Sequence, residues 1–384
     1  MGAALQTGNS RAALVLDQQC PPPVRSVHGC GMIRVALLIS ALALCTFTAW
    51  GLDQDPANGR PSTPEFREIW AYLMPGEEKG LAGTEPITDL CVFGASLTKD
   101  GRIAARIARP AVTLRGGAQP SIHLVIADLS NQALMHFALD SRYGVTPLLV
   151  DDICRVSENF DGVQIDFEAV SPDDAEAFFD FLKVLKSRLP AGKTLSVAVP
   201  ARTKRTSDAY DYSRIAPIVD RMIVMAYDEH WSTSAPGPVA SLPWCAKIAD
   251  FAKSTVGIGK LIMGLPLYGR AWQDKSLARA LRFENVQSLV LEKNSATDYT
   301  PELGAWFEYS ETVVVSVFYD DVRSIMDKLL LYRDRYITAV SFWRIGQGPP
   351  QLWDSIAVAV AAPASTADQS AAFSAPSNGR AVAR

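Results

Sequence analysis

The stretch from Asp161 to Glu168 reads Asp-Gly-Val-Gln-Ile-Asp-Phe-Glu, and its alternation of polar and apolar residues is typical of a β-strand. In a strand, Gln164, Asp166 and Glu168 share one face. Asp166 and Glu168 then lie about 6.5 Å apart, at about 3.3 Å per residue. Two carboxyl groups this close repel each other when both are charged, so one of them should have a raised pKa and keep a proton near neutral pH. The spacing therefore predicts acid–base chemistry, with Glu168 at the end of the strand as the general acid.

The apolar residues of the same stretch indicate where the strand lies. Val163, Ile165 and Phe167 form a continuous apolar face on the other side of the strand. The alternative, an exposed edge strand whose acidic side chains are simply solvated, would not need such a face. A row of polar side chains that points into a protein interior is costly unless it serves a site. We therefore expect Gln164 and its two acidic neighbours to point inward. Asp161 is out of phase with them, and we expect it to support the start of the strand.

Eight short runs of β-branched or apolar residues predict the strands of the fold. They cover residues 69–75, 87–97, 121–129, 162–169, 194–201, 221–230, 260–269 and 337–345. Amphipathic segments of helical period separate most of them, as at 173–189 and 321–335. This alternation predicts an α/β fold with a parallel sheet, and we expect the sheet to close into a (β/α)₈ TIM barrel. The alternative, an open doubly wound sheet, needs a glycine-rich turn after its first strand, where residues 74–78 are acidic instead.

Active sites of such barrels form at the carboxyl ends of the strands, which is where Glu168 is expected. The gap between the seventh and eighth runs is too long for one helix. We therefore expect a small α+β insertion between strands 7 and 8, at about 271–315, with strand content at 312–318. Residues 66–360 are assigned to the barrel with its insertion.

Both ends of the chain are expected to lie outside this domain. Residues 35–50 form a short apolar run after a basic residue and before a small-x-small site, which is typical of a secretory signal peptide. We assign 1–51 to a leader and signal peptide, with Met32 as the expected true start, and expect export to the periplasm, the cell envelope or the medium. A lipid anchor at Cys45 is a minor alternative, because Leu44 stands where a small residue is needed. Residues 361–384 are rich in Ala, Ser and Pro and are expected to be a disordered tail.

Composition and cysteine spacing exclude several other classes of function. The 384 residues carry a net charge of −4, which gives no electrostatic footprint for nucleic acid. We find no phosphate-binding loop and expect no nucleotide. Cys91, Cys154 and Cys245 are far apart in the sequence, so we expect no metal and no cofactor. We expect the protein to be a monomer.

Four motifs resemble those of glycoside hydrolase family 18, the chitinase-like family. They are Asp-x-x-x-x-Asp-x-Glu at 161–168, Met-Ala-Tyr-Asp at 225–228, Leu-Pro-Leu-Tyr-Gly-Arg at 265–270 and Ser-Phe-Trp at 341–343. They fall in order at the ends of four expected strands, and the similarity covers roughly 66–358. Segments 225–231, 236–244, 318–324 and 342–346 are most similar to the bacterial spore-cortex-lytic type of this family, a peptidoglycan N-acetylglucosaminidase.

The resemblance implies a substrate-assisted mechanism, in which the substrate's own 2-acetamido group is the nucleophile. Glu168 would protonate the glycosidic oxygen and later activate water. Asp166 would orient the acetamido N–H and stabilise the positive oxazolinium intermediate. Tyr227 would donate a hydrogen bond to the attacking carbonyl oxygen, with Asp228 positioned beside it.

The resemblance also implies a set of substrate-binding residues. Trp343 at the end of the eighth strand would form an apolar floor under the sugar at the cleavage site. Tyr72 and Arg270 are further candidates for contact with the substrate. Gln164 stands where the family usually has an aspartate that shares a proton with the next one, although the spore-cortex type typically has a neutral amide there.

The expected activity is hydrolysis of β-1,4 bonds after N-acetylglucosamine, with retention, in peptidoglycan or its fragments. The partner would be a polysaccharide that contains N-acetylglucosamine, either peptidoglycan or chitin oligomers. Two alternatives stay open. One is a chitinase or endo-N-acetylglucosaminidase of the same family, and the other is a catalytically silent glycan-binding barrel.

Overall fold

The computed structural model describes residues 63–105, 108–114, 117–273, 277–310 and 314–359. The expected leader and signal peptide (1–51), with Met32 and Cys45, and the expected tail (361–384) lie outside these residues and stay predictions. Within the described ranges, none of the helices combines the length and the apolar character that a membrane span requires.

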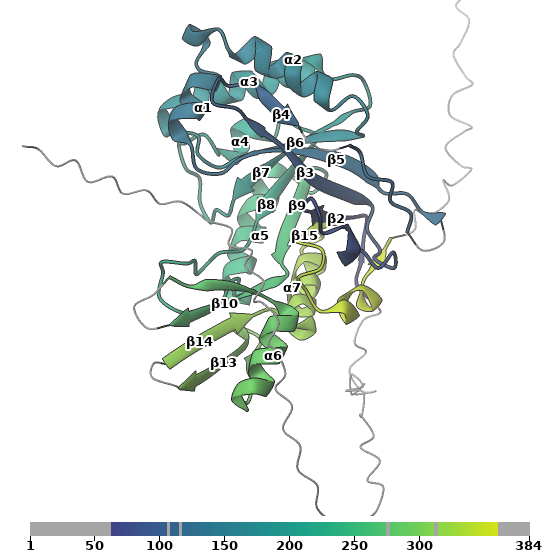
Figure 1. Ribbon diagram of the computed structural model, residues 1–384, viewed down its shortest axis with the longest axis vertical. Coiled ribbons are helices and arrows are strands. Elements are labelled where there is room, and N and C mark those ends of the chain that lie inside the picture. Colours follow the sequence, from purple (N-terminus) through teal and green to yellow (C-terminus); the bar gives the residue numbers. More distant parts are fainter. Residues whose placement is uncertain (1–62, 106–107, 115–116, 274–276, 311–313, 360–384) are drawn as a thin grey trace, which may run out of the picture. The chain divides into compact units, whose positions relative to one another are not determined.

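Eight parallel strands form a closed barrel in the described part of the chain (Figure 1). In chain order they are β2 (Glu68–Leu73), β3 (Asp89–Leu97), β5 (Ser121–Asp128), β6 (Gly162–Phe167), β7 (Thr194–Pro200), β8 (Arg221–Met225), β9 (Leu261–Pro266) and β15 (Ala339–Trp343). The first strand, β2, pairs with β3 on one side and with the last strand, β15, on the other. This closure confirms the predicted barrel and excludes the open doubly wound sheet, which would end in two unpaired edges.

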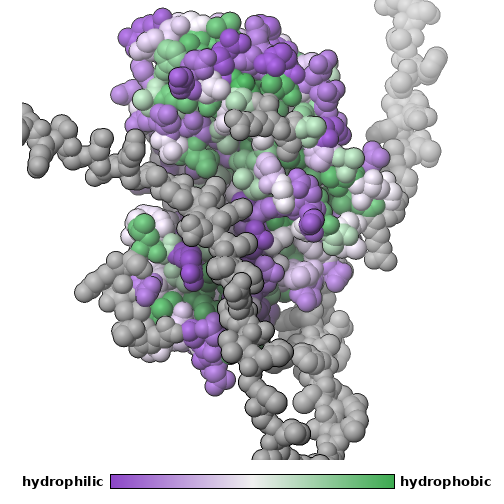
Figure 2. Space-filling view, viewed as in Figure 1, coloured by the Kyte–Doolittle hydropathy of each residue, from purple (hydrophilic) through white to green (hydrophobic). Residues whose placement is uncertain are grey.

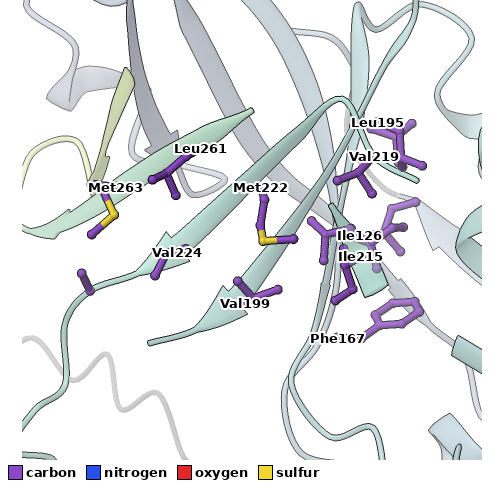
Figure 3. Packing of buried hydrophobic residues seen from close by; sticks show 14 of the residues in the cluster. Ile126, Phe167, Leu195, Val199, Ile215, Val219, Met222, Val224, Leu261 and Met263 are labelled. Atoms are coloured by element: carbon purple, nitrogen blue, oxygen red, sulfur yellow. The ribbon is translucent and has the colours of Figure 1, made fainter. Parts of the chain in front are cut away.

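The outward-facing side chains of the strands form the main hydrophobic core, between the barrel and its helices. Figure 3 shows Val199 of β7, Met222 of β8 and Leu261 of β9 within this layer. Phe167 of β6 belongs to it as well, and its ring stacks on Phe181 of a covering helix, with ring centroids 5.8 Å apart. The period of two that predicted the strand therefore also predicted which side of it packs against helices.

The inward-facing side chains fill the barrel and form a second, smaller cluster. Its buried members are Trp70, Tyr72, Cys91, Phe93, Val125, Ile223, Ile262 and Ala339, and Trp343 packs against them. Gln164 and Asp166 of β6 point into the same interior and are buried. Polar groups thus interrupt an otherwise mostly apolar barrel interior at β6.

Helices cover the barrel unevenly. The α-helices of the described chain are α1 (Gln132–Leu139), α2 (Thr146–Val156), α3 (Ala175–Arg188), α4 (Tyr212–Ile215), α5 (Leu242–Val256), α6 (Phe283–Lys293) and α7 (Val322–Asp334). Among the described residues, the β2–β3 connection has the 3₁₀ turn Glu78–Gly80 and the β3–β5 connection has the short strand β4 (Ile103–Ala105), and neither contains an α-helix. Hydrophilic residues are prominent on the outer surface over α2 and α3 (Figure 2). Each of these helices therefore buries one face against the barrel and exposes the other face to solvent.

Sequence signals at the helix ends explain where two of these helices start. A 3₁₀ turn, Pro172–Asp174, leads into α3, and the Asp173 N–H donates to Oγ of Ser171 at 3.3 Å. At α7, the Ser324 N–H donates to Oδ1 of Asp321 at 2.9 Å and the Ser324 hydroxyl accepts from the Asp321 N–H at 3.0 Å. This reciprocal capping box starts the helix one residue after Asp321.

The insertion between β9 and β15 contains an antiparallel sheet and helix α6. Its strands are β10 (Tyr268–Gln273), β11 (Arg279–Arg282), β12 (Asp298–Thr300), β13 (Gly304–Ser310) and β14 (Val314–Tyr319), in the spatial order β11-β10-β14-β13-β12. Val286 of α6 packs with Leu281, Phe307 and Val317 in a separate core. The insertion therefore runs from Tyr268 to Tyr319, a few residues beyond the expected 271–315. A two-stranded parallel pair, β1 (Glu65–Phe66) with β16 (Ala357–Val358), brings together the two ends of the described chain.

Two of the predicted strand ends were wrong. The run 221–230 is a strand only to Met225, because Asp228 adopts φ of 60°, a left-handed conformation that a strand does not allow. The run 260–269 contains the whole of β9, which ends at Pro266, and the start of β10. Just after β9, the Leu267 N–H still donates a hydrogen bond to the Trp343 carbonyl of β15, at 2.6 Å. The chain then enters the insertion at Tyr268. Both differences lie at the mouth of the barrel, by which we mean the loops after the carboxyl ends of its strands.

Candidate active site

The polar face of β6 runs from the barrel interior to its mouth. Gln164 is fully buried and Asp166 is 5% exposed, whereas Glu168, just after the strand, is exposed. The Glu168 N–H still donates to the Asp128 carbonyl of β5 at 2.9 Å, so the backbone at Glu168 continues the ladder. The period of two thus places three polar side chains at increasing height, and the outermost carboxyl can meet a substrate.

Both carboxyl groups titrate near neutrality. Burial, followed by the charge of Glu168, raises the pKa of Asp166 to about 7. Partial burial, followed by the charge of Asp228, raises the pKa of Glu168 to about 6 although one side of the group is open to solvent. A carboxyl whose pKa is raised towards neutrality and which is open to solvent has the properties of a general acid.

Two buried oxygen atoms below Glu168 lack hydrogen-bond partners among the described residues. They are Oδ1 of Asp166 and Oε1 of Gln164. The amide nitrogen of Gln164 donates to Oγ of Ser196 on β7 at 3.3 Å. Buried polar atoms without partners are rare and often mark functional sites, so these two oxygens indicate a site rather than a purely structural network.

Asp228 and Arg270 meet although they lie on different parts of the chain. The Tyr268 hydroxyl donates to Oδ1 of Asp228 at 2.6 Å, and Nε and Nη2 of Arg270 donate to the same oxygen at 3.0 and 2.7 Å. Arg270 was expected on the seventh barrel strand but lies on β10 of the insertion, as does Tyr268. Tyr268 was not predicted, although the period of two in Tyr-Gly-Arg places it on the same face as Arg270.

Tyr227 lies among the acidic groups. Burial, followed by the charges of Asp166, Glu168 and Asp228, raises its pKa well above the usual range, so its hydroxyl keeps its proton and can donate a hydrogen bond. A Cβ at Gly264 would lie 3.1 Å from Cε1 of Tyr227 and 2.9 Å from the Val224 carbonyl. Glycine at that position of β9 therefore lets the Tyr227 ring lie close to the strand.

An aromatic cluster forms the other side of the site. Trp343 is half-buried at the end of β15, and its ring centroid lies 5.3 Å from that of Tyr72 and 5.1 Å from that of Phe93. Burial, followed by the nearby Cys91, Tyr227 and Asp166, raises the pKa of Tyr72 well above its usual range, so its hydroxyl keeps its proton. Phe93 was not predicted, because nothing in its run distinguishes it from a core residue.

Tyr210 is a second residue that the sequence analysis missed. Its hydroxyl donates to the Phe167 carbonyl at 2.7 Å and accepts from the Val170 N–H at 3.1 Å. These contacts hold the backbone on both sides of Glu168. Tyr210 lies in an irregular loop after β7, where no periodicity or motif marks it.

Asp161 lies at the opposite end of β6. Its Oδ2 accepts from the Ile122 N–H at 2.7 Å and pairs with Nη2 of Arg109 at 2.7 Å, so it joins the start of β6 to β5. Within the described residues, no group of three or more His, Cys, Asp or Glu side chains is arranged to hold a metal ion.

The arrangement matches a known family of carbohydrate-active enzymes. A family model described as glycosyl hydrolases family 18 matches residues 149–348, which include β6, β8, the insertion and β15. The chain belongs to glycoside hydrolase family 18. Members of this family hydrolyse glycosidic bonds, and the exposed carboxyl of Glu168, with its raised pKa, fits that chemistry.

Relatives within family 18 include proteins named for sporulation and for the spore cortex. The chain is 34% identical over 227 residues to the putative sporulation-specific glycosylase YdhD of Bacillus subtilis, which covers 56% of this chain and 54% of that protein. The chain thus spans about half the length of that relative. It is 28% identical over 321 residues to the cortical fragment-lytic enzyme of Bacillus cereus, covering 74% and 73% of the two chains.

A solved structure of the family has the same fold. The crystal structure of the Bacillus cereus spore cortex-lytic enzyme SleL superposes with a TM-score of 0.68 at 27% identity. The match covers 77% of this chain and 74% of that one. The family, expected from four short motifs, is therefore confirmed, and the expected similarity to its spore-cortex-lytic type is found among these relatives.

Proposed function

We propose that this protein is a retaining glycosidase that cleaves β-1,4 bonds after N-acetylglucosamine in peptidoglycan or its fragments. The observation that carries the proposal is the carboxyl of Glu168, which is open to solvent at the barrel mouth and has a pKa raised to about 6. Asp166, with its free buried Oδ1, lies one inward-facing position below it on the same strand. This pair supplies the acid and the electrostatic partner that a substrate-assisted cleavage needs.

In the first step, Glu168 gives its proton to the glycosidic oxygen, and the bond between that oxygen and the anomeric carbon breaks. The carbonyl oxygen of the sugar's 2-acetamido group forms a new bond to the anomeric carbon from the opposite face, which gives an oxazolinium ion. The Tyr227 hydroxyl donates to this carbonyl oxygen, and Asp166 accepts from the acetamido N–H. In the second step, the Glu168 carboxylate takes a proton from water, whose oxygen attacks the anomeric carbon. The bond between that carbon and the acetamido oxygen breaks, which frees the 2-acetamido group and restores the original configuration.

Gln164 takes part in this scheme as a support for Asp166. Near neutral pH Asp166 is protonated part of the time, and Gln164, which precedes it on the same inward face of β6, presents an Oε1 without a partner among the described residues. When the oxazolinium ion forms, the positive charge favours the carboxylate form of Asp166. The amide of Gln164 cannot take up the proton that Asp166 loses. We therefore propose that this proton passes to solvent or to the substrate at this step.

The substrate assignment rests on the relatives together with the site. Peptidoglycan is favoured over chitin because the relatives with broad coverage are named as cortical fragment-lytic enzymes. A silent glycan-binding barrel is disfavoured, because binding alone does not require an exposed carboxyl with a raised pKa. We also propose export to the cell envelope or beyond, on the basis of the apolar run at 35–50.

The test is to digest purified peptidoglycan and, separately, N-acetylglucosamine oligomers, and to identify the new reducing ends by mass spectrometry. We expect reducing N-acetylglucosamine ends from peptidoglycan. Cleavage of the oligomers alone would assign a chitinase, and binding without cleavage would assign the silent barrel.

Two variants make this test specific for the mechanism. Glu168→Gln should lower kcat by about 10² to 10⁴, the usual contribution of a general acid. Glu176→Gln, which removes an exposed carboxylate paired with Arg214 on the outer side of α3, is the matched control and should keep wild-type activity. Full activity of Glu168→Gln would refute the assignment of the acid.

A further inference from the structure

Two arginines share one carboxylate at the mouth of the barrel. Oε1 of Glu77, in the loop after β2, accepts from Nη2 of Arg282 at 2.8 Å and from Nη2 of Arg344 at 2.9 Å. Arg282 ends the insertion strand β11, and Arg344 follows β15. The cluster therefore joins the first barrel loop, the insertion and the last barrel loop.

The charges of this cluster do not cancel. Two guanidinium groups face a single carboxylate, which leaves one positive charge among the three side chains. The side chains of Arg344 and Glu77 are 15% and 16% exposed, whereas that of Arg282 is 42% exposed. The excess charge therefore reaches solvent through Arg282, whose remaining N–H groups can meet an anion.

The cluster adjoins the proposed reaction site. Arg344 follows Trp343 directly, and its Cζ lies 5.7 Å from the centre of the Trp343 ring. In the pairing of β10 with β11, Arg282 lies opposite Tyr268, whose hydroxyl donates to Asp228. Arg344 is thus a neighbour of Trp343, and Arg282 is a neighbour of the Tyr268 that contacts Asp228.

We propose that Arg282 and Arg344 bind a carboxylate of the substrate, on the sugar next to the N-acetylglucosamine that is cleaved. This inference rests on the proposed function. In peptidoglycan each N-acetylglucosamine is followed by a muramoyl unit, which carries a lactyl carboxyl group, either free or extended by a peptide with its own carboxylates. Chitin is neutral at the corresponding positions. The arginine cluster therefore selects the anionic glycan, and a guanidinium suits this task because its paired N–H donors match a carboxylate.

The experiment compares kcat/KM for four substrates: glycan strands with peptides, peptide-free strands with free lactyl carboxyls, the same strands after amidation of those carboxyls, and N-acetylglucosamine oligomers. Arg282→Gln should lower the ratio of kcat/KM for free-carboxyl over amidated strands about tenfold, the usual loss for one charge-assisted hydrogen bond. Arg282→Lys should recover part of that ratio. A loss confined to peptide-bearing strands would support a carboxylate of the peptide, and a loss on peptide-free strands would support the lactyl group.

Arg279→Gln is the matched control. Arg279 is exposed on the same strand and pairs with Ala271, so its side chain points to the opposite face of β11 from Arg282. The Arg279→Gln substitution removes the same charge as Arg282→Gln. It should leave the ratio of kcat/KM for free-carboxyl over amidated strands at its wild-type value. An equal loss on all substrates in Arg282→Gln would overturn the inference, because it would reduce the cluster to a structural clamp. If the wild-type enzyme releases no N-acetylglucosamine ends from peptidoglycan, the proposed function fails and this inference fails with it, whereas cleavage with an unchanged ratio overturns the inference alone.

Discussion

Tyr210 offers the sharpest test of how the fold positions the general acid. Tyr210→Phe removes one oxygen atom, which now bonds to the Phe167 carbonyl at 2.7 Å and to the Val170 N–H at 3.1 Å. Glu168 lies between these two backbone groups in the sequence. We expect the backbone around Glu168 to relax and the distance from its carboxyl to the scissile oxygen to become less well defined.

The magnitude follows from the burial of the groups involved. Tyr210 is 8% exposed and Val170 is 6% exposed, so the Val170 N–H would be left without a partner away from water. A buried polar group without a partner costs about 1–3 kcal/mol of the free energy of unfolding. For catalysis, a displacement of about 1 Å at the reacting groups can cost about 10² in rate, so we expect kcat to fall by about 10- to 100-fold with a smaller change in KM.

Tyr212→Phe is the control for stability. The Tyr212 hydroxyl is buried in a similar way and donates to the Pro200 carbonyl at 2.6 Å, at the end of the neighbouring strand β7, so its hydrogen bond does not go to the backbone on either side of Glu168. Urea unfolding and steady-state kinetics on the same preparations separate the two effects. Both variants should lose stability, and only Tyr210→Phe should lose kcat. A wild-type kcat for Tyr210→Phe, or an equal fall in both variants, would refute the positioning role.

Three further predictions concern charged groups. Because the pKa of Glu168 is raised to about 6, the fraction of enzyme with a protonated general acid falls as pH rises past that value. We therefore expect kcat/KM to fall on the alkaline side of its pH profile. The apparent pKa values of that profile belong to the coupled pair of Glu168 and Asp166. Asp228→Asn removes the negative charge that helps to keep this proton, so the alkaline limb should move to lower pH; a limb that moves up would contradict the assignment. Away from the site, Lys328 and Asp320 form a fully buried ion pair, and Lys328→Met should lower the free energy of unfolding in urea by about 3–5 kcal/mol. Replacing both partners by apolar residues should cost less than the single change, and the reverse order would show that the pair itself is stabilising.

The barrel was predictable because its signal is local and repeated. Period-two runs separated by helical segments mark each strand without reference to the rest of the chain. On β6 the same period assigned Val163 and Phe167 to the helix side and Asp166 to the interior, as the structure shows. The strand ends were less predictable, since Asp228 leaves the β conformation in a run whose composition alone would continue it.

The sequence by itself determined the order of the strands, the polar face of β6 and the position of Glu168 at its end, because each of these depends on residues that are near neighbours in the chain. Only the tertiary structure decided how Glu168 is held by Tyr210 and that Arg270 reaches Asp228 from the insertion. It also brought Glu77 to Arg344, 267 residues further along the chain. The spacing on β6 predicted a raised pKa for one carboxyl group, but the burial of Asp166 and the nearby charge of Asp228 at Glu168 arise only in the folded barrel. Contacts between distant segments exist only after the barrel has closed, so no local pattern could have predicted them.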